Sequence, residues 1–286
     1  MNNQFQLTGA TVRGKNHRLT DANNQDAWHI AMNDEAIACA VCDGCGSEPH
    51  SEVGAKLGVR WVTEALLNHA DLYSPANQTA DRQTHETDRN FWTLVQNTVL
   101  ARMSLLAKHL GGSFDEIIEK HFLFTIVGAI LTDCGTTFFA VGDGLIAING
   151  ETETLQPMSG NQPLYLGYAL SPRKYILPVK LMFRVIRTLP TEEVQSFCLG
   201  TDGANDLLAN ADRNLPGKNE PLGPLAQFWD EDRYFANPDA LRRRLFLANR
   251  EVRHVDWLKR AIVADNGLLP DDTTLIAGRR KKENSQ

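Results

Sequence analysis

Aspartates recur where short apolar runs of this 286-residue sequence begin or end. Asp43, Asp143 and Asp202 are each followed by glycine, and the pair Asp271-Asp272 stands directly before an apolar run. Aspartate is a poor strand former, so these positions predict carboxylates at strand ends, where they can gather at one edge of the sheets. An all-oxygen site of this kind suits hard cations such as Mg²⁺ or Mn²⁺. The spacing alone fits ordinary Asp-Gly turns equally well, so it leaves the metal site open.

The cysteines raise the question of a second kind of metal site. Cys39, Cys42 and Cys45 are evenly spaced by three residues, as in some thiolate clusters. However, Cys39 and Cys42 fall in the apolar run 36–42, where a strand would point them to opposite faces, and no fourth ligand follows at a suitable spacing. We therefore expect small, buried hydrophobic side chains in a reducing cytoplasm.

Composition and charge argue against several classes of function. The net charge of −6 disfavours a general nucleic-acid binder, which would normally be basic. No run of about 18 apolar residues occurs, so we expect no membrane span, and the N-terminus lacks the apolar core of a signal peptide. The basic cluster Arg279, Arg280, Lys281 and Lys282 is interpreted as a solvated terminus.

The pattern of apolar residues predicts more strands than helices. Strands are expected at residues 36–42, 122–132, 136–141, 194–199 and 273–277, with one or two more in 174–189. Helices are expected at 51–69, 89–110 and 238–264, with a polar loop at 71–88 and an irregular insertion at 210–238. This order favours an α+β sandwich over a regular βαβ alternation.

Two of the expected helices carry an apolar stripe. For helix 51–69 we expect Ser51 as the N-cap and a buried side made of Val53, Leu57, Trp61, Ala65 and Leu66. Trp61, Trp92 and Trp257 are interpreted as core residues on such stripes rather than as a stacking platform for nucleic acid.

Five short motifs together resemble the metal-dependent protein phosphatases of the protein phosphatase 2C family, in particular its divergent bacterial branch. They are "NQDA" at 24–27, "VCDGCGS" at 41–47, "VGDG" at 141–144, "GTDGAND" at 200–206 and "DDTTLI" at 271–276. The resemblance runs from about residue 9 to residue 277. It implies a β-sandwich of two antiparallel sheets flanked by helices, in four layers (αββα). It also implies one catalytic domain over residues 1–278, followed by a basic tail at 279–286.

The resemblance assigns metal-binding roles to particular residues and implies two Mg²⁺ or Mn²⁺ ions, with a third at a weaker site. The residues are Asp26, Asp43, Gly44, Asp143, Asp202, Asp206 and Asp271. Asp43 would bridge both metals, the Gly44 carbonyl would face one of them, and Asp26 would act through water. Asp202 and Asp271 would complete the shell of the other metal, while Asp143 and Asp206 match the positions that serve the third. Such a pair of ions would activate a water for in-line attack on phosphate.

Three positions depart from the family pattern. The usual Glu before the first Asp is Gln25, and Cys45 stands where the family carries its acid histidine. The family's phosphate-binding Arg would fall on Asp21 without a gap, whereas a short insertion places His17 there with Arg18 adjacent. These changes remove cationic or acidic assistance, and they predict a slower enzyme or one with an unusual substrate.

The leading hypothesis is a metal-dependent phosphatase that acts on phosphoserine or phosphothreonine in proteins, opposite a partner kinase. One alternative is an inactive, metal-binding relative that works as a regulatory or interaction module. Another is a phosphohydrolase of small-molecule phosphates. His50 could replace the missing acid, but it also fits a surface loop, and Thr201 fits a capping or packing role. Asp272 competes with Asp271 as a ligand, and the family position favours Asp271.

Overall fold

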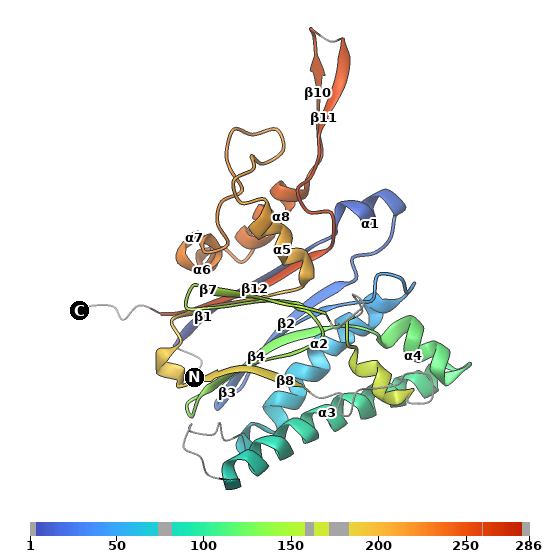
Figure 1. Cartoon of the computed structure of the whole chain (residues 1–286), viewed down its shortest axis with the longest axis vertical. Coiled ribbons are helices and arrows are strands. Elements are labelled where there is room, and N and C mark those ends of the chain that lie inside the picture. Colours follow the sequence, from blue (N-terminus) through green and yellow to red (C-terminus); the bar gives the residue numbers. More distant parts are fainter. Residues whose placement is uncertain (1–3, 74–81, 158–162, 172–182, 259, 282–286) are drawn as a thin grey trace, which may run out of the picture.

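The computed structural model describes residues 4–73, 82–157, 163–171, 183–258 and 260–281. Two five-stranded antiparallel sheets pack face to face at its centre, and helices cover both outer faces (Figure 1). This arrangement confirms the expected α+β class and the four-layer αββα sandwich. The structure contains no helix in these ranges that is long and apolar enough to cross a membrane.

The first sheet joins the two ends of the chain. Its strands, in spatial order, are β1 (Phe5–Val12), β12 (Thr273–Arg280), β9 (Ser196–Gly200), β6 (Gly144–Ile148) and β7 (Glu151–Leu155). β1 and β12 pair along their whole length, from Phe5 opposite Arg280 to Val12 opposite Thr273. The expected strand at the C-terminal end is therefore confirmed, and it runs three residues further than predicted.

The second sheet contains the most completely buried strand. Its order is β2 (Asp26–Met32), β3 (Ala36–Asp43), β4 (Ile126–Thr132), β5 (Thr136–Val141) and β8 (Arg184–Leu189). Every residue of β3 before Asp43 is buried, because this strand is covered on both faces. Cys39 packs between the sheets while Cys42 packs toward the helices, so these thiols lie on opposite faces as expected.

Helices α2 (Ser51–Asn68), α3 (Arg82–Leu110) and α4 (Phe114–Phe122) cover the second sheet (Figure 1). The prediction for α2 was right for Ala65 and Leu66, which are buried, and for Trp61, which packs against the core, but wrong for Val53 and for the N-cap. Ser51 is the first helical residue and His50 holds the N-cap position. The buried face carries Ala55, Val59, Val62 and Leu66, whereas Val53 is exposed. Gly58 explains the rotation, because a Cβ there would lie 2.5 Å from the Phe124 ring, so only a small face can approach the sheet.

Shorter helices cover the first sheet: α5 (Asn205–Ala209), α6 (Gln227–Asp230), α7 (Arg233–Ala236) and α8 (Ala240–Asn249). The segment 210–238, expected to be irregular, contains two of them between turns. Buried polar contacts hold it together. Tyr234 donates to Gln227 Oε1 at 2.8 Å, and Arg244 donates to the carbonyl oxygen of Leu222 at 2.7 Å.

The predicted helix 238–264 was wrong beyond Asn249. The chain instead forms a hairpin of β10 (Val252–Asp256) and β11 (Ala261–Asp265), which projects from the body of the molecule (Figure 1). Trp257 lies at its turn and is 82% exposed, so its prediction as a core residue was also wrong. Residues in this segment suit a strand as well as a helix, because Val252, Val255 and Ile262 are β-branched.

Further boundaries differ from the predictions. The strand expected at 122–132 begins only at Ile126, because Phe122 is the last residue of α4. α3 begins at Arg82, so the second half of the expected polar loop is helical, while residues 74–81 lie outside the described residues. The expected basic tail begins inside β12. Arg279 donates to Asp232 Oδ1 at 2.6 Å and lies over the ring of Phe235. These contacts anchor Arg279 in the sandwich, whereas residues 282–286 and most of the expected strand region 174–189 lie outside the described residues.

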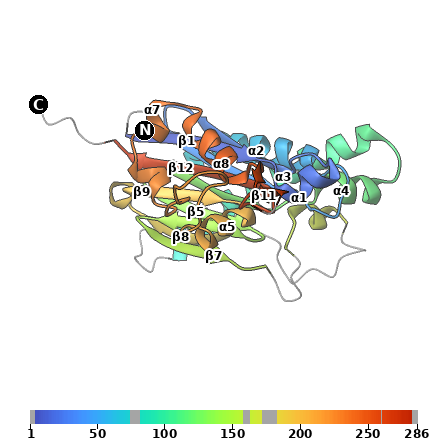
Figure 2. The ribbon, with the colours of Figure 1, turned by 90° about the horizontal axis from the view of Figure 1, so that it is seen from above.

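One end of the sandwich is distinct from the end that carries the termini. Both views place α1 (Lys15–Thr20) at the end away from the N- and C-terminal labels (Figures 1 and 2). β2 begins and β3 ends at the α1 end. The residue that follows β9 and the start of β12 also meet there, because Thr201 N donates to Thr274 O. The strand ends that carry the aspartates therefore meet at the same end of both sheets.

Candidate metal and phosphate site

The sheet register brings the first two aspartates together. Asp26 is the first residue of β2 and Asp43 the last residue of β3, and the two lie directly opposite each other. Asp202 begins the 3-10 helix η4 (Asp202–Ala204), two residues after the end of β9. Asp143 directly precedes β6, and Asp271 lies two residues before β12.

Asp43 is at the electrostatic centre of this group. Its pKa is raised well above the usual value, first by burial and then by four neighbouring carboxylates, which are Asp26, Asp202, Asp271 and Asp143. Four like charges can act on one carboxyl only when all of them lie near it. The structure therefore brings five of the predicted metal residues into one cluster.

The pKa values of Asp143, Asp202 and Asp206 are also raised. Burial raises the pKa of Asp143 to about 6, and the charge of Asp202 adds to the effect. The pKa of Asp202 is raised by burial and by Asp271, against a hydrogen bond with Asp43 that lowers it. The pKa of Asp206 is raised by burial and by the charges of Asp271 and Asp202. The carboxylates repel one another, and a cation among them would relieve the repulsion.

Asp26 is the most deeply buried member. Its side chain is 2% exposed, and its pKa is raised well above the usual value by burial and by the charge of Asp272. Thr201 donates to Asp26 Oδ2 at 2.7 Å and so links the two sheets. The other carboxylate oxygen, Oδ1, is buried and has no hydrogen-bond partner among the described residues. An acceptor of this kind suits a metal-bound water or a cation.

Asp272 organises the loops around the cluster. Its Oδ1 accepts from the backbone N–H of Gly14 at 2.6 Å, and its Oδ2 accepts from Gln25 N at 2.6 Å. His17 Nδ1 lies 2.8 Å from the same Oδ2. Both oxygens of Asp272 thus have protein partners, whereas Asp271 is exposed beside the cluster. This geometry favours Asp271 as the metal ligand and gives Asp272 a positioning role, which the sequence pattern did not reveal.

His17 and Arg18 have different surroundings although they are adjacent on α1. His17 is held against Asp272 and lines a cavity beside the cluster. Arg18 donates instead to the backbone oxygen of Asn249 and, at 3.3 Å, to its Oδ1. The guanidinium therefore ties α1 to the end of α8, while the imidazole faces the site.

Cys45 lies where the resemblance implies an acid. Its sulfur is 3.2 Å from Ser47 Oγ, and it contacts the buried side chain of Tyr165. The pKa of Tyr165 is raised by burial and by this hydrogen bond with Cys45, so the phenol stays protonated. Tyr165 was not singled out in the sequence, because nothing near residue 165 resembles a site motif. Gly44 is tightly enclosed, since a Cβ there would lie 2.8 Å from Ser51 Oγ.

The cluster fits divalent cations by its chemistry but is not a closed coordination shell. Across the described ranges, no three His, Cys, Asp or Glu side chains are already arranged to hold one ion. The donor set is nevertheless all oxygen and strongly acidic, and it contains the unpartnered Asp26 Oδ1. Hard cations of the Mg²⁺ or Mn²⁺ type match that donor set.

Comparisons with known proteins agree with the fold. A bacterial serine phosphatase superposes with a TM-score of 0.50 at 14% identity, covering 97% of this chain and 98% of the other. A form of a bacterial serine phosphatase with an arginine-to-glutamate substitution gives 0.50 at 12% identity, with 98% and 100% coverage. The S. agalactiae serine/threonine phosphatase gives 0.46 at 15% identity, with 97% and 100% coverage. At these identities the first two structures show the fold alone.

A search of curated proteins found no match. The family model described as protein phosphatase 2C, however, matches residues 13–245, which is most of the chain. The chain belongs to the protein phosphatase 2C family.

Proposed function

We propose that this protein is a Mg²⁺- or Mn²⁺-dependent phosphatase that hydrolyses phosphoserine and phosphothreonine in proteins. The observation that carries the proposal is the carboxylate cluster, in which the pKa of Asp43 is raised by four neighbouring aspartates. A cluster of like charges is unfavourable for the folded state on its own, so its presence at one edge of both sheets supports a cation-binding role. Members of the family generally depend on Mg²⁺ or Mn²⁺.

The residues in and around the cluster have different proposed roles. Asp43, Asp202 and Asp271 would hold two ions, with Asp26 acting through water, the Gly44 carbonyl as a further donor, and Asp143 and Asp206 at a third site. When bound, the ions lower the pKa of a bridging water and screen the charge of the phosphate. Thr201 and Asp272 keep the two sheets and the 14–25 segment in place around the cluster.

His17 is the better candidate of the two for contact with a substrate phosphate. Its ring is oriented by Asp272 and lies beside the cavity, whereas Arg18 is engaged by Asn249. A histidine bonded to a carboxylate at one nitrogen presents its other nitrogen as a donor to phosphate oxygens when protonated. Cys45 is the candidate for proton transfer to the leaving group, and Tyr165, whose raised pKa makes it a weaker acid, would position the thiol through their hydrogen bond.

A second candidate is a weakly active or inactive relative that serves as a regulatory module. The observation in its favour is that Arg18 contacts Asn249 and not the cluster, so the guanidinium does not stand ready for phosphate. The retained carboxylate cluster favours the enzyme. We further propose a single catalytic domain, a partner kinase that phosphorylates the substrate, and a cytoplasmic setting, which the five free cysteines support.

The test is phosphate release from an aryl phosphate and from a phosphothreonine peptide, each with Mn²⁺, Mg²⁺ or EDTA. The proposal predicts hydrolysis of the peptide with either metal and none with EDTA. Hydrolysis of the aryl phosphate but not of the phosphothreonine peptide would instead favour a small-molecule phosphohydrolase. Metal binding without hydrolysis of either substrate would favour the regulatory module.

A further inference from the structure

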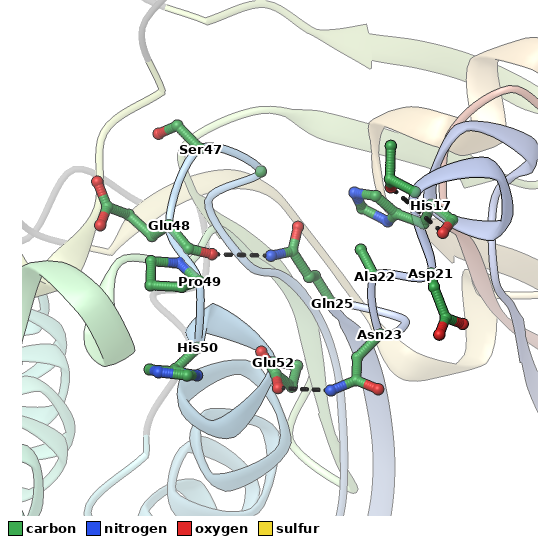
Figure 3. Close-up of a pocket in the computed structure, with 12 residues that line it drawn as sticks. His17, Asp21, Ala22, Asn23, Gln25, Ser47, Glu48, Pro49, His50 and Glu52 are labelled. Atoms are coloured by element: carbon green, nitrogen blue, oxygen red, sulfur yellow. Dashed lines mark hydrogen bonds between the residues drawn. The ribbon is translucent and has the colours of Figure 1, made fainter.

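A cavity of about 430 Å³ is lined by Gln25, the residue before Asp26 of the carboxylate cluster. Figure 3 shows the residues around it. It lies between the loop that follows Cys45 and the segment that joins α1 to β2. Gln25 lies on its floor between Glu48 and His17, as Figure 3 shows, and the next residue in the chain is Asp26 of the cluster. A substrate whose phosphate reached the cluster would therefore place its neighbouring residues at this cavity.

The cavity holds hydrogen-bond acceptors that have no donor. Gln25 is 5% exposed and donates through Nε2 to Glu48 O at 2.9 Å, while its buried Oε1 has no partner. Glu52 is 8% exposed and accepts from Asn23 at 2.9 Å through Oε1, while its buried Oε2 has no partner. The side-chain amides of Gln25 and Asn23 each already donate one hydrogen bond, to Glu48 O and to Glu52 Oε1. A ligand of this cavity must supply donors.

The charge of the cavity points in the same direction. Asp21, Glu48 and Glu52 line it, and within the described chain no lysine or arginine does. Its two histidines have contacts of their own, because His17 Nδ1 lies against Asp272 and His50 packs against His121 with ring centroids 5.1 Å apart. Such a surface attracts a cation that carries several N–H donors.

We propose that this cavity binds the guanidinium or ammonium group of a basic residue close to the phosphorylated residue of the protein substrate. The proposal rests on the proposed phosphatase function and adds the sequence preference of the substrate. Glu52 and Gln25 supply the buried acceptors, and Glu48 and Asp21 supply charge at the rim. Arginine fits best, because its five donors can satisfy several acceptors at once.

The experiment compares phosphothreonine peptides that carry a single arginine at each position on either side of the phosphoresidue with peptides that carry citrulline there. Citrulline keeps the shape of arginine and removes its charge. The wild-type protein with Mn²⁺ should show a kcat/KM at least about fivefold higher for arginine at one position, since charge-assisted hydrogen bonds are the stronger ones. Glu48→Gln and Glu52→Gln should each lower that ratio toward one.

Glu35→Gln is the matched control, because Glu35 is exposed in the turn before β3, at the opposite end of that strand from Asp43. It should keep the wild-type ratio. Glu48 lies on a loop, so its variant remains informative if Glu52→Gln fails to fold. Equal kcat/KM for arginine and citrulline at every position of an active enzyme would overturn the proposal, as would a preference that survives both variants.

A binding measurement separates this proposal from the proposed function. If no peptide is hydrolysed with any metal, the phosphatase function fails, and fluorescence anisotropy with labelled forms of the same peptides in EDTA then decides the cavity. Tighter binding of the arginine peptide that weakens in Glu48→Gln would support the cavity proposal. Equal binding of the arginine and citrulline peptides would refute it.

Discussion

Substitution of Asp143 tests how much an ionised, buried carboxylate of the cluster destabilises the protein. Its side chain is 8% exposed, and burial together with the charge of Asp202 raises its pKa from 3.8 to about 6. We predict that Asp143→Asn stabilises the metal-free protein at neutral pH. The amide keeps the size of the side chain and an acceptor oxygen, and it removes the charge that Asp202 repels.

The size of the effect follows from the pKa. A rise from 3.8 to about 6 corresponds to about 3 kcal/mol of unfavourable ionisation in the folded protein. The cluster borders solvent, and screening there reduces charge interactions, so we expect about 1–2 kcal/mol at neutral pH. A gain of this size is a substantial part of the stability of a typical domain.

The direction of the pKa shift determines how the stability difference between variant and wild type changes with pH. An acid with a raised folded-state pKa is protonated in both states below the unfolded value of 3.8, and it then contributes nothing to the difference. The destabilisation develops as the pH rises from that value and is complete above about 6. The difference in free energy of unfolding between variant and wild type should therefore be near zero below about pH 3 and reach its maximum above about pH 7.

Equilibrium urea unfolding in EDTA, followed by tryptophan fluorescence, measures this difference at several pH values. Asp34→Asn is the control, because Asp34 is exposed in the turn between β2 and β3. A variant at Asp143 that is no more stable than wild type at neutral pH would refute the reasoning. So would a gain that stays constant across the pH range, because it would not arise from ionisation.

The remaining predictions concern the chemistry and the loops around it. Asp43→Asn should abolish Mn²⁺ binding by calorimetry and phosphate release together, and retained activity would contradict the bridging role. Cys45→His should raise the rate for substrates with poor leaving groups and change it little for aryl phosphates with good ones; an equal response would count against a position beside the leaving group. His17→Ala should bind Mn²⁺ normally and lose at least about tenfold in kcat/KM, equivalent to about 1.4 kcal/mol, and an unchanged value would remove His17 from phosphate binding. Arg18→Ala should lower the free energy of unfolding by about 1–3 kcal/mol in urea unfolding, because Asn249 loses a charged donor; no loss would show that this contact is dispensable.

Much of the fold could be predicted because local patterns specify it. The run before Asp43 is apolar without a break and ends at Asp-Gly, and it forms the buried strand β3. The helix α3 ends at Leu110, before Gly111 and Gly112, both of which have positive φ. In such places the sequence pattern and the tertiary structure favour the same conformation.

The errors arose where tertiary contacts decide between local alternatives. The hairpin around Trp257 has an apolar pattern that also fits a helix, and two antiparallel strands were not recognised in it. In α2 the apolar stripe suggested Val53 on the buried side, whereas Gly54 and Gly58 are the residues that lie against the Phe124 ring. Sequence periodicity alone does not contain the shape of the opposing surface.

The candidate site also combines residues that the local sequence identifies with contacts that it cannot predict. The aspartates at strand ends were identifiable singly, and their convergence follows from pairing such as that of Asp26 with Asp43. The contact of His17 with Asp272 joins residues 255 positions apart, so no local pattern could predict it. Cys45 and its hydrogen-bond partner Tyr165 are also far apart in the sequence.

The central claim is that the aspartates at the strand ends hold divalent cations. An anomalous difference map from crystals grown with Mn²⁺ tests it most directly, because it locates the metal without reference to activity. We predict a peak about 2 Å from a carboxylate oxygen of Asp43, with Asp202 and Asp271 in reach of the same or a neighbouring peak. Crystals that bind Mn²⁺ only elsewhere, or not at all, would contradict this account of the protein.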